Sequence, residues 1–193
     1  MAVTQRITVE RVGTGEFSIM IRDTRFRLER KPKHMVLQAL SGQDVTEQLD
    51  VYPRPDGIKV SVRDRKGATL THVMELDDDG MASTTQVGSQ TFLVDPTTEY
   101  VEAFGAEIRD AEGPSIPHIL QFGKELNSDQ QLRNALRIAA ERSGGDTVLK
   151  LSPSCREICD AAGNPFAMEL VGAAGAAALA AACVGCHLQE SGL

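Results

Sequence analysis

The alternation of apolar and polar residues across the first hundred positions constrains this chain most. Ile7 and Val9 alternate with polar neighbours, and so do Phe17, Ile19 and Ile21. The same period of two recurs at Phe26 and Leu28 and at Ile58, Val60 and Val62. Such a period places one face of each strand in a core and the other in water. The segment therefore predicts half-buried β-strands.

Turn-forming residues separate these segments, at 13–15, 53–57, 65–67 and 79–80. Proline fixes φ and glycine supplies positive φ, so both favour chain reversal. Seven or eight short strands at this spacing are typical of an antiparallel sandwich or barrel. We therefore expect an α+β fold, with an antiparallel β sandwich or barrel followed by a small α-helical C-terminal module.

The pattern changes after about residue 103. Residues 104–127 contain several glycines and prolines and predict a connecting segment with one short helix. Ser128 is a candidate N-cap, with Gln131 three residues later, for a helix that Gly144-Gly145 would end. The expected organisation is a β-rich domain over 1–103, a connecting segment over 104–127, and a helical, cysteine-bearing module over 128–193.

Two further helices are predicted within this module. One starts near Ser152 or Ser154 and ends at Gly163, and the last runs from Asn164-Pro165 toward Cys186. The last helix is rich in Ala and Gly and carries no charge from Leu170 to Cys186. A close-packed buried helix is the main interpretation. Contact with a protein or a membrane through this helix is the alternative.

Charge and composition exclude some partners and suggest a location. The formal net charge is −7 and aromatic residues make up 4%, which argues against nucleic-acid binding by phosphate contacts or by stacking. The N-terminus has early charges and no apolar signal segment. We expect a chain that is cytoplasmic as synthesised, with export of the C-terminal module after any processing.

All four cysteines lie near the C-terminus, as Cys155, Cys159, Cys183 and Cys186, and His187 follows directly. Thiolates with an imidazole suit a tetrahedral zinc site, and a cytoplasmic location favours thiols or metal over disulfides. Cys183 to His187 also matches the CxxCH pattern of c-type haem attachment. The chain has few aromatic residues and no export signal, and both argue against haem. Besides metal, haem and disulfides, the cysteines could simply be buried thiols that bind nothing.

Two disulfides joining the two cysteine pairs are possible only under one geometric condition. A straight helix over 165–187 would place Cys183 roughly 27 Å beyond the preceding turn, whereas Cys155 lies about 12 Å before it. Disulfide bonding requires Cα atoms within about 7 Å. A disulfide or a shared metal site therefore predicts a break in the last helix, at 172–175.

The segment 146–193, which follows Gly144-Gly145 and is rich in Cys, Gly and Ala, resembles the core of bacteriocin-like peptide precursors. The resemblance implies a leader or immunity-type N-terminal part, cleavage after Gly145, and an antimicrobial C-terminal peptide. We therefore expect a non-enzymatic, peptide-releasing precursor. The alternative is an intracellular zinc-binding or protein-interaction protein that uses the C-terminal cysteines.

Basic residues crowd one predicted strand region, and they are a candidate patch for an acidic partner. The residues are Arg22, Arg25, Arg27 and Arg30. Because Arg25 and Arg27 alternate with Phe26 and Leu28, we expect both arginines to point away from the core. A solvated strand face that protects a sheet edge is the other interpretation.

Overall fold

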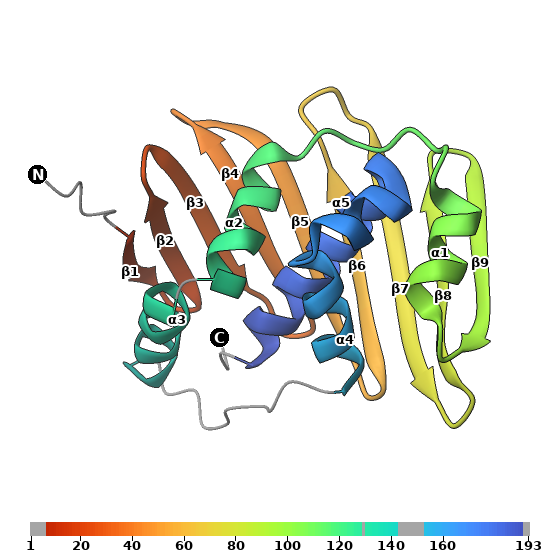
Figure 1. The fold of residues 1–193 in the computed structure, drawn as a ribbon. Helices are drawn as coiled ribbons and strands as arrows, with labels where there is room; N and C mark the ends of the chain where they lie inside the picture. Colours follow the sequence, from red (N-terminus) through yellow and green to blue (C-terminus); the bar gives the residue numbers. More distant parts are fainter. Residues whose placement is uncertain (1–6, 129, 143–152, 191–193) are drawn as a thin grey trace, which may run out of the picture.

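In the computed structural model, which describes residues 7–128, 130–142 and 153–190, strands come first and helices follow (Figure 1). The strands are β1 (Ile7–Gly13), β2 (Glu16–Ile21), β3 (Thr24–Arg30), β4 (Met35–Ser41), β5 (Asp44–Arg54), β6 (Gly57–Arg63), β7 (Thr69–Asp77), β8 (Gly80–Val87) and β9 (Gln90–Thr97). The helices are α1 (Tyr100–Ile108), α2 (Pro117–Ser128), α3 (Gln130–Arg142), α4 (Pro153–Ala162) and α5 (Pro165–Glu190).

Each strand pairs antiparallel with the next, which gives one sheet in the order β1 to β9. The predicted α+β class and the antiparallel pairing are confirmed. The sheet is open in its pairing, since β1 pairs only with β2 and β9 only with β8 within the described residues. Helices rather than a second sheet cover its inner face (Figure 1). A period of two reports that one face is buried, but not what buries it.

The helices pack on the sheet through one continuous apolar core. The strands contribute Phe17, Phe26, Leu49 and Val60 to it, among others. Gly185 on α5 allows close approach, because a Cβ there would lie 2.7 Å from Ile58 Cδ1 on β6. Small residues thus bring the backbone of α5 against the centre of the sheet.

A buried carboxylate ties α2 to the sheet. Glu47 on β5 is 3% exposed, and its two oxygens accept hydrogen bonds from the backbone N–H groups of His118 and Ile119, both at 3.0 Å. These N–H groups belong to the first turn of α2 and have no partner within the helix. Burial raises the pKa of Glu47, although the two hydrogen bonds oppose that shift.

The range 104–127 is more ordered than the expected connecting segment. It contains most of α1 and nearly all of α2, and each helix buries several apolar side chains in the core. Glycine in a sequence indicates a loop, whereas in this range it permits helix contact. A Cβ at Gly105 would lie 2.9 Å from the Leu170 carbonyl oxygen, and one at Gly123 would lie 3.3 Å from Val184.

Ser128 does not precede a helix as its N-cap. It is the last residue of α2, and its hydroxyl donates to the Lys124 carbonyl at 2.6 Å. The next helix, α3, begins at Gln130, and residue 129 lies outside the described residues. A serine hydroxyl can bond either end of a helix, so its spacing to Gln131 is not decisive.

The last helix is broken where the sequence predicted. Gly172 has φ 74° and ψ −174°, a conformation that is essentially restricted to glycine. A Cβ at this position would also lie 2.2 Å from the Arg109 carbonyl oxygen. The predicted helices that start near Ser154 and at Pro165 are present as α4 and α5. The break lets the second part of α5 return toward α4.

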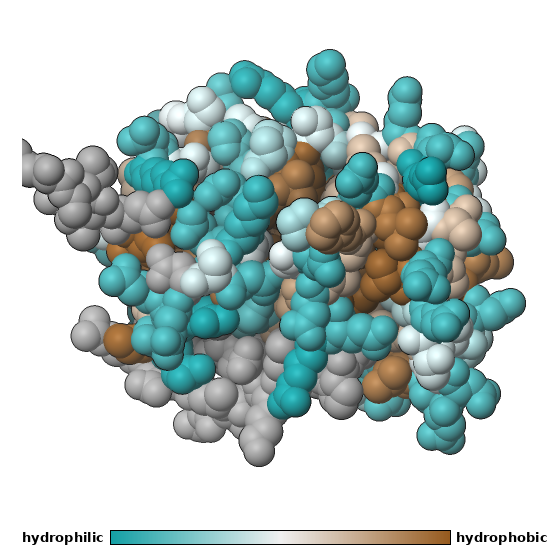
Figure 2. All heavy atoms as spheres, in the orientation of Figure 1, coloured by the Kyte–Doolittle hydropathy of each residue, from teal (hydrophilic) through white to brown (hydrophobic). Residues whose placement is uncertain are grey.

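The Ala/Gly-rich part of α5 is mainly a core element. The segment Pro165–Gln189 is long and apolar enough to cross a membrane, but 61% of its most apolar window is buried inside the protein. Figure 2 shows a largely hydrophilic helix-covered face, with apolar atoms gathered over α5 and between α5 and α1. The exposed large apolar side chains of α5 are Phe166 and Leu170.

Candidate disulfide and metal site

The four cysteines form two facing pairs between α4 and α5. Cys155 is joined to Cys186 with Cα atoms 5.8 Å apart, and Cys159 to Cys183 with Cα atoms 4.9 Å apart. Each helix presents both of its cysteines on one face, at spacings of four and three residues. The thiols are therefore paired rather than free. Because the earlier cysteine of α4 pairs with the later cysteine of α5, the two helices run antiparallel at the disulfides.

Asn127 on α2 and His187 on α5 complete the surroundings of the Cys159–Cys183 disulfide. The His187 Nε2–H donates to Asn127 Oδ1 at 2.9 Å, and this oxygen lies 3.2 Å from Cys183 Sγ. The Asn127 amide donates from Nδ2 to the Cys159 carbonyl at 3.2 Å. One asparagine thus connects all the groups of the site.

Three potential metal ligands meet at this point. One ligand atom each from Cys159, Cys183 and His187 lies within 4.8 Å of the others, and all three residues are buried. A tetrahedral zinc ion with Zn–S bonds of about 2.3 Å holds two sulfurs roughly 3.8 Å apart. A bonded sulfur pair is too close and carries no thiolate, so metal binding requires reduction.

The protonation state of His187 suits a ligand. Burial, with the nearby Arg133 guanidinium adding to it, lowers the pKa of His187 to about 4. The imidazole is therefore neutral at neutral pH, which is the form that binds metals. The chemistry of the donor set, two sulfurs and one imidazole, fits zinc.

The structure separates the five predicted metal ligands into two groups. Cys159, Cys183 and His187 lie together, whereas Cys155 and Cys186 form a second disulfide outside this cluster. Sequence reasoning missed Asn127. Asn127 lies four residues after Gly123, and therefore on the same side of α2. Gly123 approaches Val184 of α5, so this spacing was the one feature of the sequence that could have indicated Asn127.

Covalent haem does not fit the CxxCH motif. Both sulfurs, of Cys183 and Cys186, are engaged in disulfides. The motif also lies inside α5, where Cys183 is 0% and Cys186 1% exposed. A porphyrin attached to both sulfurs would have to displace the sheet or α4.

Two cavities adjoin the residues of the Cys159–Cys183 disulfide. One, of about 630 Å³, is lined mainly by apolar and small residues of α2 and α5 and reaches Cys183. The other, of about 410 Å³, is polar and reaches Cys159 and His187. Asn127 lines both. Cys183 thus lines one cavity and Cys159 the other.

The remaining predicted sites have different outcomes. Gly144 and Gly145, the predicted cleavage residues, lie outside the described residues. The four arginines of the predicted basic patch, Arg22, Arg25, Arg27 and Arg30, are exposed, as expected for residues that point away from the core. Among the described residues, Arg27 pairs with Glu16 at 2.7 Å and Arg22 with Glu125 at 3.6 Å. These carboxylates reduce the patch's net charge.

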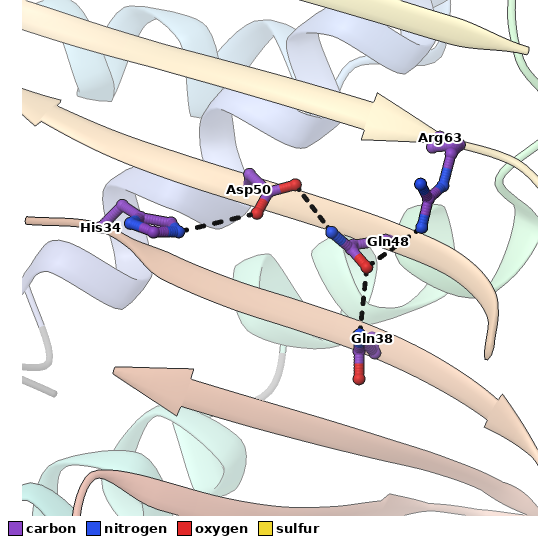
Figure 3. Close-up of polar contacts among 5 residues, drawn as sticks. All are labelled: His34, Gln38, Gln48, Asp50 and Arg63. Carbon is purple, nitrogen blue, oxygen red and sulfur yellow. Dashed lines mark hydrogen bonds and ion pairs between the residues drawn. The ribbon is translucent and has the colours of Figure 1, made fainter. Parts of the chain in front are cut away.

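The sheet face without helices carries a polar network (Figure 3). Gln48 on β5 accepts from Gln38 at 3.0 Å and from Arg63 at 3.4 Å, and donates to Asp50 at 2.9 Å. His34 lies 3.9 Å from Asp50. The groups satisfy one another across neighbouring strands, as cross-strand pairs do on solvated sheets. The network therefore keeps this face hydrophilic.

A second polar cluster is buried between the sheet and α1. His72 Nδ1 lies 2.7 Å from Thr85 Oγ1, and the Tyr100 hydroxyl donates to Ser83 Oγ at 2.7 Å. Burial lowers the pKa of His72 to about 4 and raises that of Tyr100. His72 and Tyr100 are both 0% exposed, so a substrate has no access to either.

No protein-family model, curated protein or solved structure matches this chain. Fold and site alone define its class. It is an α+β protein in which helices cover one face of an open antiparallel sheet, and two disulfides join one of these helices, α5, to α4.

Proposed function

We propose that this protein is a non-enzymatic binding protein with a thiol-dependent metal site. In the reduced chain, Cys159, Cys183 and His187 would bind zinc, and the fourth ligand would come from Asn127 or from water. In the oxidised chain, the Cys159–Cys183 disulfide closes the site. Bound zinc would supply a structural link between α4 and α5.

One observation carries the proposal: two sulfurs and an imidazole from two helices converge within 4.8 Å in a buried place. Buried histidines and cysteines are common separately, but three ligands of these two types at this separation match what zinc requires. The neutral imidazole supports it as well, because the ion need not displace a proton from His187.

The scaffold supports the same interpretation. α4 and α5 pack against each other and contribute to one apolar core, so reduction of the disulfides leaves the ligands on packed helices. A site held by packed helices loses less entropy when an ion binds than a site on loops. A reducing compartment such as the cytoplasm would keep the site open.

The test is zinc binding by the full-length chain, reduced with a phosphine under anaerobic conditions. We expect one zinc per chain by native mass spectrometry, and none for the oxidised chain. Cys183→Ser and His187→Ala should each weaken zinc binding by at least 10-fold, the order seen when a ligand or its support is lost.

The matched control is the double variant Cys155→Ser/Cys186→Ser, which removes the other disulfide and leaves the cluster intact. It should bind zinc as the wild type does. Zinc binding that is equally weak in both sets of variants, or absent from the reduced wild type, would refute the proposal.

The precursor hypothesis remains a prediction, and the burial of α5 lends it less support. Residues from Ala177 to Leu188 are buried, and they cover Val51, Ile58 and Val60 of the sheet. Release of a peptide containing α5 would expose this apolar face to water. Intact mass measurement of the protein from its own cells would detect a fragment beginning near Asp146.

A further inference from the structure

The polar cavity beside Cys159 is the feature of the molecule with the most unassigned chemistry. Asn127, Arg133, Arg156, Cys159, Asp160, Gly163 and His187 line its volume of about 410 Å³. That volume is within the range of small-molecule sites. Within the part of the chain that the structure describes, neither Arg133 nor Arg156 forms an ion pair.

The charges of the cavity select a class of ligand. Two guanidinium groups can bind carboxylates, and Arg133 is held at the site by its hydrogen bond of 3.5 Å to the Asn127 carbonyl. The Asp160 carboxylate can bind an ammonium group. A ligand with both charges, as in an amino acid or a short peptide, complements this arrangement better than a simple anion does.

The disulfide in the cavity wall adds a reaction. Cys159 is 7% exposed and lines this cavity, whereas Cys183 is 0% exposed and faces the other one. A thiol in the polar cavity therefore lies beside Cys159 and not beside Cys183. Neither Cys155 nor Cys186 lines either cavity, so the second disulfide is out of its reach.

We propose that this cavity binds an amino-acid-derived thiol, bearing a carboxylate and an ammonium group, which reduces the Cys159–Cys183 disulfide. The inference names the reductant that opens the metal site, and it rests on the proposed function in that respect. Binding in this cavity would make the reduction of the Cys159–Cys183 disulfide faster with such a thiol than with other thiols.

The reaction balances with two thiols. The first thiolate attacks Cys159 Sγ and forms a mixed disulfide there, and the electron pair of the old bond leaves with Cys183 as a thiolate. A second thiolate then attacks the ligand's sulfur in the mixed disulfide. Cys159 leaves as a thiolate, and the two ligand thiols end as their own disulfide. The two electrons gained by the protein come from these thiols.

The test follows the reduction of each disulfide in the oxidised, full-length chain, by rapid alkylation and mass spectrometry of the cysteines. Glutathione carries carboxylates and an ammonium group, cysteamine carries only the ammonium group, and 2-mercaptoethanol carries neither. Per thiolate, we expect glutathione to reduce Cys159–Cys183 about 10-fold faster than 2-mercaptoethanol, with saturation, and a mixed disulfide at Cys159.

Variants separate binding from simple accessibility. Arg133→Gln combined with Arg156→Gln should remove the advantage of glutathione and leave the rate with 2-mercaptoethanol unchanged. Arg137→Gln is the matched control, since Arg137 is an exposed arginine of α3 that does not line the cavity. Equal rates per thiolate for all three thiols, or an equal loss in the control, would overturn the proposal.

The metal site is tested independently, because phosphine reduction needs no bound thiol. If the phosphine-reduced chain binds no zinc while glutathione keeps its advantage, the metal function is refuted and the thiol site stands. If zinc binds and glutathione has no advantage, only the thiol site is refuted.

Discussion

Replacing Gly172 by alanine tests how the fold brings the cysteines together. The backbone of Gly172 has φ 74° and ψ −174°, and alanine in this region costs about 1–3 kcal/mol. The new Cβ would also lie 2.2 Å from the Arg109 carbonyl oxygen, which forces a backbone shift. Overpacking of this kind costs roughly 1–3 kcal/mol. We expect Gly172→Ala to lower the free energy of unfolding by about 2–6 kcal/mol in total.

The matched variant is Gly42→Ala. Gly42 also has positive φ, at 63°, but a Cβ there meets nothing within 4 Å. Only the backbone cost of about 1–2 kcal/mol should remain. Urea denaturation of both oxidised variants measures the difference. If Gly172→Ala lowers the free energy of unfolding no more than Gly42→Ala does, the close approach of α5 to Arg109 does not fix the break at Gly172. The explanation that this break brings the two cysteine pairs together would then be refuted.

Three further perturbations test the core and its buried charges. The pKa values of His72 and His187 are about 4 in the folded chain, below the unfolded value of about 6.5, so only the unfolded chain gains protons as pH falls between these values. Stability should thus be complete above pH 6.5 and fall toward pH 4, by up to about 3 kcal/mol per histidine, in urea titrations at several pH values; a flat profile would contradict the burial of both rings. Glu47→Ala removes the acceptor for the first turn of α2 and should cost about 1–2 kcal/mol in thermal denaturation, against at most about 0.5 kcal/mol for the exposed Glu75→Ala. Gly185→Val places side-chain atoms against β6 and should destabilise by roughly 2–4 kcal/mol in the same assay, and a neutral result would show that α5 does not lie so close to the sheet.

The local predictions succeeded where one residue's backbone chemistry was decisive. The break in the last helix was predicted for the case in which the two cysteine pairs meet, because a straight helix cannot return Cys183 to Cys159. The antiparallel strands follow from alternation and turn residues. Ser128 and the range 104–127 were predicted wrongly, because serine and glycine each serve two purposes. Glycine permits a turn, but it equally permits two helices to touch, as Gly105 and Gly123 do.

Sequence alone determined that this chain has strands with one buried face, followed by helices with four cysteines on matching faces. These properties depend on the period of side chains along one element, which is local. Tertiary structure alone decided that the helices, rather than a second sheet, cover the strands, and that Asn127 stands beside the Cys159–Cys183 pair. It also placed Arg133 and Arg156 at one cavity with Cys159. Such contacts join residues of α2, α3, α4 and α5, and no pattern within one segment specifies which segments pack together.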